Sequence, residues 1–246
     1  MKPYYLLTML FLICIACKKE KQEQGNIQVN FRNIVNGGPL VLNTGAYTNA
    51  NGETFNVTTF KYYISNISLV KMDNSKLRIP DTYFLVDENA AASKSISFKA
   101  PTGEYRGIAF KIGVDSVRNV SGAQTGALDP VNGMFWSWNS GYIMAKMEGT
   151  SPASAEAGHT LTFHIGGFKG NFNAVQDVEL VSPISLTVGL TRKPQLTLTA
   201  DLFNWFTGVH LVKFSETATI HVPGEAAWKV ATNYRSMFSI TDVTDL

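Results

Sequence analysis

The sequence predicts an all-β protein, an antiparallel β-sandwich with one short C-terminal helix. Two observations predict it. About ten short segments alternate apolar and polar residues, and most are bounded by Gly, Pro, Asn or Asp. Long helical patterns do not separate these segments, which argues against repeated strand–helix units. The composition is also suitable, because 45% hydrophobic residues, 15 Phe and 9 Tyr among 246 residues provide a core for one domain.

The first 16 residues are expected to be a secretory signal peptide. Lys2 precedes an apolar run from Leu6 to Ala16, which is too short to span a membrane as a mature helix. The run ends in CIAC, which resembles the bacterial lipobox, with Cys17 at the position of the lipidated cysteine. Cys14 stands where that pattern usually has Leu, so an ordinary secretory cleavage site is the alternative. Either site predicts export of the mature chain.

Residues 17–25 are predicted to form a polar tether, and residues 26–246 the folded domain. After Cys17 the tether reads KKEKQEQG and contains no apolar residue. Both cysteines precede the domain, which excludes disulfides and cysteine-bound zinc within it. The net charge of +2 gives no electrostatic reason to expect nucleic acid as a partner.

The predicted strands begin with the alternating residues Ile27, Val29 and Phe31, and the turn sequence NGGP follows at 36–39. The same kind of pattern predicts further strands at residues 59–70, 83–86, 95–98, 105–112, 142–148, 160–165, 178–187, 195–201 and 217–222. Each of these segments can bury one face and expose the other, as a sandwich requires.

One helix is predicted at residues 225–238. Glu225 lies in its first turn, where a negative charge is favourable, and Trp228, Ala231 and Tyr234 recur at helical spacing. We expect this helix to pack against the sandwich near the C-terminus.

His164 and His221 are candidate metal ligands. They end two segments with the same pattern, Thr-x-Thr-x-His. Alternate residues of a strand share a face, so each imidazole projects with its two threonines and away from the core. If the two strands are neighbours, the rings can converge on one metal, and imidazole suits Cu, Zn, Fe and Ni. The alternative is two separate surface histidines. His159 and His210 lack the shared pattern.

Trp136 and Trp138 form a second candidate site. If their segment is extended, both indoles lie on one face. Paired tryptophans form either part of a core or a platform on which a ligand such as a sugar stacks. The sequence contains no nucleophile elbow, phosphate loop or H-E-x-x-H helix, so a binding protein rather than an enzyme is expected.

Seven segments occur in a characteristic order: FKYYISNISL at 60–69, GVDS at 113–116, GALDP at 126–130, GMFWSWNSGY at 133–142, KMEG at 146–149, FHIG at 163–166 and NYRSMF at 233–238. Together they resemble the MbnP-like family of copper-binding proteins, named after a periplasmic protein encoded beside methanobactin genes. The likeness extends from about residue 27 to residue 238. It implies a β-sandwich copper protein of the periplasm or the outer surface.

The resemblance also implies a copper site and a partner. The histidine of FHIG is His164, and the histidine before the C-terminal helix is His221; both would be copper ligands. Trp136 or Trp138 would be oxidised to kynurenine by a di-haem cytochrome c peroxidase-like protein. The lipid on Cys17 would anchor the protein as a periplasmic or outer-membrane lipoprotein.

At one position the sequence departs from the family. Members often carry a histidine two residues after the Phe of the first strand, where this chain has Asn33. Because an amide is a poorer copper ligand than imidazole, a three-histidine site would be reduced to two. A member that has lost its metal is therefore one alternative. Another is a surface module that binds a glycan or protein ligand through Trp136 and Trp138 without a metal.

Overall fold

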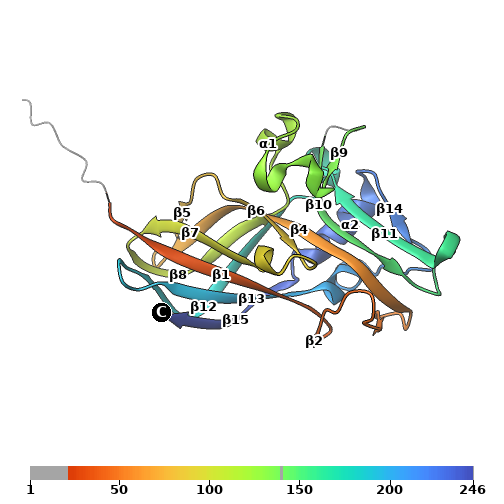
Figure 1. Ribbon diagram of the computed structural model, residues 1–246, viewed down its shortest axis with the longest axis horizontal. Helices are drawn as coiled ribbons and strands as arrows, with labels where there is room; N and C mark the ends of the chain where they lie inside the picture. Colours follow the sequence, from red (N-terminus) through yellow and green to blue (C-terminus); the bar gives the residue numbers. More distant parts are fainter. Residues whose placement is uncertain (1–21, 139–140, 246) are drawn as a thin grey trace, which may run out of the picture.

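The protein is a β-sandwich of two sheets, as a computed structural model shows for residues 22–138 and 141–245 (Figure 1). The expected signal peptide, Cys17 and most of the expected tether lie outside these described residues. The first strand begins at Gln24, inside the stretch predicted as tether, because Gly25 and Gln24 pair with the end of another strand. No helix in the described ranges is long and apolar enough to cross a membrane.

The smaller sheet contains the first and the last strands of the chain. Its strands are β1 (Gln24–Val35), β2 (Gly38–Pro39), β7 (Ser95–Pro101), β13 (Pro194–Asp201) and β15 (Phe238–Asp245). The order is β15-β13-β1-β2, with β7 also paired to β1. The β1–β13 pair is parallel, and the others are antiparallel.

The larger sheet carries both candidate histidine segments. Its main strands, in order, are β12 (Gln176–Val188), β8 (Gly103–Ile112), β4 (Thr54–Lys71), β10 (Gly141–Thr150), β11 (Thr160–Gly166) and β14 (Thr219–Ile220). The short strands β3 (Tyr47–Thr48), β5 (Lys76–Arg78) and β6 (Tyr83–Asp87) pair with β4, and β9 (Phe135–Trp136) pairs with β10. The β11–β14 pair at one edge is parallel.

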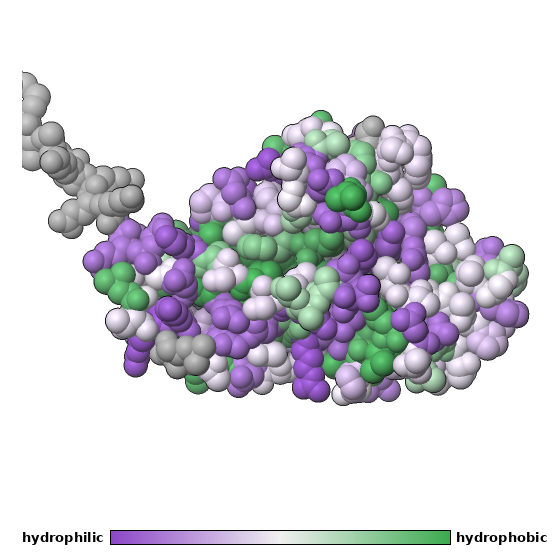
Figure 2. All heavy atoms as spheres, in the orientation of Figure 1, coloured by the Kyte–Doolittle hydropathy of each residue, from purple (hydrophilic) through white to green (hydrophobic). Residues whose placement is uncertain are grey.

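The core lies between the two sheets and is rich in aromatic rings. Phe31 of β1 packs edge-on against Tyr62 of β4 and Phe238 of β15, with ring centroids 6.0 and 6.1 Å apart. Phe110 of β8 contacts Phe238 at 5.1 Å. Burying each such side chain contributes about 1.5–3 kcal/mol. The outer surface is mixed, and Figure 2 shows apolar residues along the middle of one face with hydrophilic residues around them.

Two α-helices lie in the described part of the chain. The first, α1 (Ser116–Val120), starts at Asp115, whose carboxylate accepts a hydrogen bond from the backbone N–H of Arg118. The second, α2 (Glu225–Tyr234), lies against β11 and buries Ala227, Val230, Ala231 and Tyr234. Short 3-10 helices are η1 (Ala91–Lys94), η2 (Gly126–Leu128), η3 (Pro130–Asn132), η4 (Ala157–His159), η5 (Gly170–Phe172) and η6 (Leu202–Trp205).

The all-β sandwich predicted from the sequence is confirmed, with three corrections. Two strand pairs are parallel, so the sandwich is mixed rather than wholly antiparallel. The C-terminal helix ends at Tyr234, and Phe238 begins β15, which the helical interpretation missed. The strand predicted at 217–222 is limited to Thr219–Ile220, because only these residues pair with β11.

Candidate metal centre

His164 lies on β11, and His221 directly follows β14, the parallel neighbour of β11. In the parallel β11–β14 pair, Thr162 faces Thr219 and Phe163 faces Ile220. The next residue of the first strand is His164, and the next residue of the second segment is His221. Phe163 is buried in the core, so Thr162 and His164 project from the outer face of β11, and His221 after the end of β14 is exposed. The two strands are neighbours, and their pairing ends at Ile220, one residue before His221.

A carboxylate on β10 holds the imidazole of His164. Nε2 of His164 donates a hydrogen bond of 2.7 Å to Oε1 of Glu148, and Oε2 of Glu148 accepts one of 3.0 Å from Thr59. The ammonium of Lys146 lies 3.7 Å from the same Oε1. The hydrogen bond from His164 and the charge of Lys146 outweigh burial and lower the pKa of Glu148 to about 2. His164 is consequently oriented by an ionised carboxylate.

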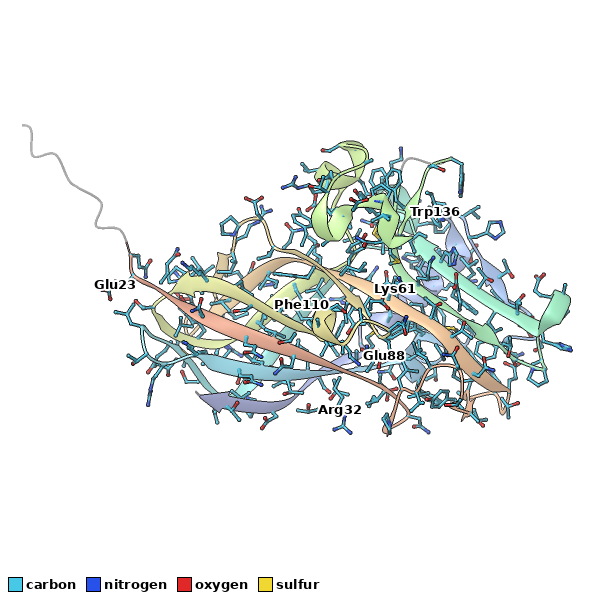
Figure 3. All side chains as sticks on the ribbon, viewed as in Figure 1. Glu23, Arg32, Lys61, Glu88, Phe110 and Trp136 are labelled. Atoms are coloured by element: carbon cyan, nitrogen blue, oxygen red, sulfur yellow. The ribbon has the colours of Figure 1, made fainter. Side chains whose placement is uncertain are left out.

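Trp136 lies on the same face of β11 as His164. Its indole covers Gly166, two residues further along the strand, so close that a Cβ on Gly166 would lie 2.3 Å from Cζ3 of the ring. Only glycine leaves room for the indole there. Strand β9, which pairs Trp136 with Gly141, holds the ring in this place above the β10–β11 part of the sheet (Figure 3).

Trp138 contacts Trp136 but lies in a different environment. The ring centroids are 5.4 Å apart at an angle of 38°. Trp136 is 6% exposed, whereas Trp138 is 62% exposed. The two indoles, which sequence reasoning could not tell apart, therefore differ: one lies beside the histidine strand and the other faces solvent.

A cavity of about 400 Å³ opens beside Trp136. Its walls include the aromatic side chains of Tyr142, Phe168 and Phe172, together with Lys169 and Pro223. Pro223 follows His221 by two residues, so the cavity adjoins both the indole and the histidine segment.

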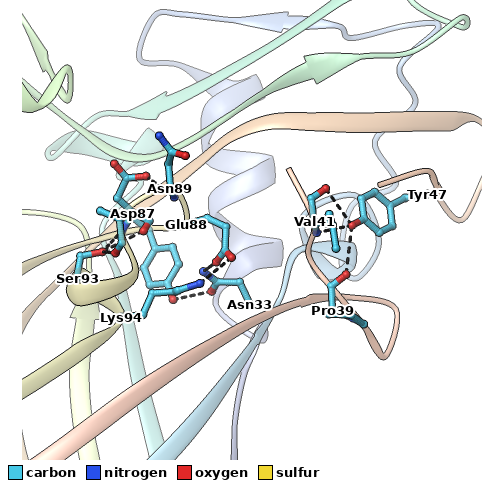
Figure 4. Close-up of polar contacts among 11 residues, drawn as sticks. Asn33, Pro39, Val41, Tyr47, Asp87, Glu88, Asn89, Ser93 and Lys94 are labelled. Carbon is cyan, nitrogen blue, oxygen red and sulfur yellow. Dashed lines mark hydrogen bonds and ion pairs between the residues drawn. The ribbon is translucent and has the colours of Figure 1, made fainter. Parts of the chain in front are cut away.

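Asn33 lies on the opposite side of the large sheet from His164. Its Oδ1 accepts a hydrogen bond of 2.9 Å from the hydroxyl of Tyr62, and its Nδ2 donates one of 2.8 Å to Glu88 (Figure 4). Tyr62 is buried in the core, whereas its neighbour Lys61 lies opposite Lys146, on the face of His164. The expectation that residue 33 belongs to one site with His164 and His221 is therefore not met.

The other two histidines do not join the pair. Nδ1 of His159 lies 2.9 Å from the carbonyl oxygen of Ser154. The ring of His210 packs against Trp228 at 5.1 Å. Across residues 22–138 and 141–245, no group of three His, Cys, Asp or Glu side chains could hold a metal ion. His164 and His221 are thus the candidate donors at this edge of the sheet, and imidazole suits Zn, Cu, Fe and Ni.

Sequence reasoning missed Glu148. The signal was present in KMEG, where Lys146 and Glu148 alternate on one face of a strand. What the sequence does not reveal is that β10 pairs with β11, which brings this carboxylate to His164.

A comparison with known protein families covers six of the seven segments, all but NYRSMF at 233–238. The sequence model of the MbnP family matches residues 24–222. Among solved structures, MbnP from Methylosinus trichosporium is similar, with 18% sequence identity, a TM-score of 0.49, and coverage of 83% of this chain and 82% of that chain. No curated protein matches. With a family match over most of its length, this chain belongs to the MbnP family.

Proposed function

We propose that this protein binds copper through His164 and His221, with Trp136 as a redox-active neighbour. The observation that supports the proposal is the pairing of β11 with β14, because His164 lies on β11 and His221 directly follows β14. His221 is exposed and directly follows β14, so its ring is open to a metal ion from solvent. The protein would sequester or deliver the metal rather than turn over a substrate.

Copper suits the donor set better than zinc does. Structural zinc sites use four protein ligands and catalytic ones use three, whereas this face offers two imidazoles. Imidazole binds metals only when neutral, so we expect copper affinity to fall as the solution becomes acidic. The family resemblance of the seven segments supports the same metal.

Copper titration of the metal-free protein tests the proposal. We expect one bound copper per chain, and loss of that copper in His164→Ala and in His221→Ala. His159→Ala is the matched control, because His159 precedes the same strand but is held by the carbonyl of Ser154. Equal stoichiometry in all three variants would remove the assignment. Failure of the unaltered protein to bind copper would favour a family member that has lost its metal.

We propose further that Trp136, rather than Trp138, is the indole oxidised to kynurenine. Trp136 covers Gly166 beside His164, whereas Trp138 is exposed. The oxidant would be a di-haem cytochrome c peroxidase-like partner, and the change adds one net oxygen and removes one carbon. Intact mass of protein from its native source measures this change. A modified peptide containing Trp138 alone would contradict the choice.

The location that we propose is the periplasm or the outer membrane, with the lipid on Cys17 as anchor. Support comes from the lipobox-like CIAC sequence alone. Expression of the full chain followed by fractionation tests it: Cys17→Ser should move the protein from the membrane fraction to the soluble exported fraction. Retention of the variant in the membrane fraction would refute the anchor.

A second candidate function is ligand binding without metal. It is favoured by the exposed ring of Trp138 and the aromatic-lined cavity beside Trp136. A glycan screen tests it. Binding that survives chelators and disappears in Trp138→Ala would support this function in place of copper binding.

A further inference from the structure

We propose that Glu148 is the positioning residue of the metal centre, holding His164 so that Nδ1 is the nitrogen offered to copper. This inference rests on the proposed function, since it concerns which atom of His164 binds the metal. It adds to that proposal a residue and a ring orientation that the histidine pattern does not contain.

Both oxygens of Glu148 already have protein partners. Oε1 accepts the hydrogen bond from Nε2 of His164 at 2.7 Å, and Oε2 accepts from the hydroxyl of Thr59 at 3.0 Å. The Thr59 contact fixes the carboxylate from β4, on the far side of β10 from β11. The carboxylate is therefore held in place before any metal arrives, and it accepts a hydrogen bond from the N–H at Nε2 of the imidazole.

The geometry of the sheet then decides which edge of the imidazole is free. His164 on β11 has β10 on one side and β14 on the other. Glu148 comes from β10 and occupies Nε2, whereas His221 follows β14. The two ring nitrogens point in divergent directions, so an Nε2 directed to β10 leaves Nδ1 for the side where His221 lies.

Glu148 is better placed as an orienting group than as a ligand. The ammonium of Lys146 lies 3.7 Å from Oε1 and is itself largely buried, so a metal cation at this oxygen would meet a fixed positive charge. A carboxylate that accepts the other N–H of a metal-binding histidine fixes its tautomer and raises its basicity.

The tautomer of His164 in the metal-free protein is a direct readout. At a pH where imidazoles are neutral, long-range proton–nitrogen correlation spectra should show His164 protonated at Nε2. Glu148→Gln is nearly isosteric, but its amide can donate to Nε2 as well as accept from it. We therefore expect a partial shift to the Nδ1-protonated tautomer, one copper still bound per chain, and affinity lower by about 10- to 100-fold.

Two further variants complete the design. Thr59→Val removes the second anchor of the carboxylate, so it should change the tautomer and the affinity in the same direction by less. Glu179→Gln is the charge-matched control, because Glu179 is exposed on β12 and pairs with Lys76 at 2.8 Å, away from both histidines. It should change neither readout.

Three results would overturn the inference. These are a native His164 protonated at Nδ1, a Glu148→Gln protein with native tautomer and affinity, and loss of the bound copper in Glu148→Gln, which would make Glu148 a ligand. Failure of the proposed function is a separate observation. If His164→Ala binds copper normally, copper binding at this pair is refuted, whereas the metal-free spectra still decide whether Glu148 orients His164.

Discussion

Gly166→Ala tests whether Trp136 lies beside His164, because it adds one methyl group where the indole crosses β11. A Cβ at Gly166 would lie 2.3 Å from Cζ3 of Trp136, whereas ordinary contacts begin near 3.4 Å. The ring must therefore move by about 1.1 Å to restore an ordinary contact. The backbone of Gly166 is not in the left-handed region, so the clash and not backbone strain sets the cost.

The expected cost follows from what surrounds the indole. Overpacking a well-packed site costs about 1–3 kcal/mol. Trp136 contacts Trp138, whose exposed ring can yield, so we expect the lower half of that range, about 1–2 kcal/mol. For a domain of this size, that free energy lowers the unfolding midpoint by about 2–8 °C.

Thermal unfolding and tryptophan fluorescence measure this effect. We expect a lower midpoint, a red-shifted emission as Trp136 leaves its buried position, and weaker copper binding. Gly38→Ala is the matched control, because its Cβ would meet only the carbonyl of Val35 at an ordinary 3.6 Å. If Gly166→Ala and Gly38→Ala show the same midpoint and emission, the placement of Trp136 is wrong.

Three other predictions concern residues that contact neither candidate histidine. Burial alone would raise the pKa of Glu53, but hydrogen bonds, chiefly from Ser215 and Asn49, outweigh it and lower the pKa below its ordinary value. The stability that the ionised carboxylate provides should therefore be lost as pH falls through that lowered pKa. In urea unfolding, the free energy of unfolding of Glu53→Gln should change less between neutral and acidic pH than that of the unaltered protein. Asn33→His should leave copper affinity unchanged in titration, since residue 33 faces the core; a gain in affinity would refute the separation of the two faces. Asn119→Ala should lower the free energy of unfolding, measured in urea, by about 1–3 kcal/mol. The reason is that the buried amide of Asn119 accepts a hydrogen bond from the backbone N–H of Tyr142, which the substitution leaves without this partner. An unchanged unfolding midpoint would contradict this prediction.

Local alternation was sufficient to predict most strands, because each strand buries one face against the same core. The segments that became β1, β4, β8 and β11 show this pattern in their residues, and the structure extends them by pairing. The strand β15 was missed because it begins at Phe238, four residues after the last residue of α2, and the helical pattern was extended to Phe238. Parallel pairing of β1 with β13 depends on contacts between distant segments, which no local pattern contains.

The candidate site was also predictable only as far as local strand patterns reach. The repeated Thr-x-Thr-x-His pattern fixes the face on which each histidine projects, and that part follows from strand geometry. It does not fix which strands are neighbours, so neither the contact of Glu148 with His164 nor the separation of Asn33 from both could be derived. The family pattern at residue 33 pointed to a third ligand position, but the structure places residue 33 on the core side of the large sheet, away from His164.

The two histidines differ in how firmly the fold holds them, which bears on how copper would bind. His164 lies inside a paired strand with its ring hydrogen-bonded to Glu148. His221 follows β14, a two-residue strand at the edge of the sheet, and its side chain is exposed. Glu53 anchors the loop before that strand by accepting from the backbone N–H groups of Phe214 and Ser215.

Copper binding would therefore consist of capture by an oriented imidazole followed by ordering of a looser one. The ordering of His221 costs conformational entropy that subtracts from the affinity. If β14 and the loop before it are held more firmly, this entropy cost should fall, and if they are loosened, it should rise. Glu53→Ala is consequently expected to weaken copper binding without touching a ligand, and equal affinity in this variant would show that His221 is ordered before the metal arrives.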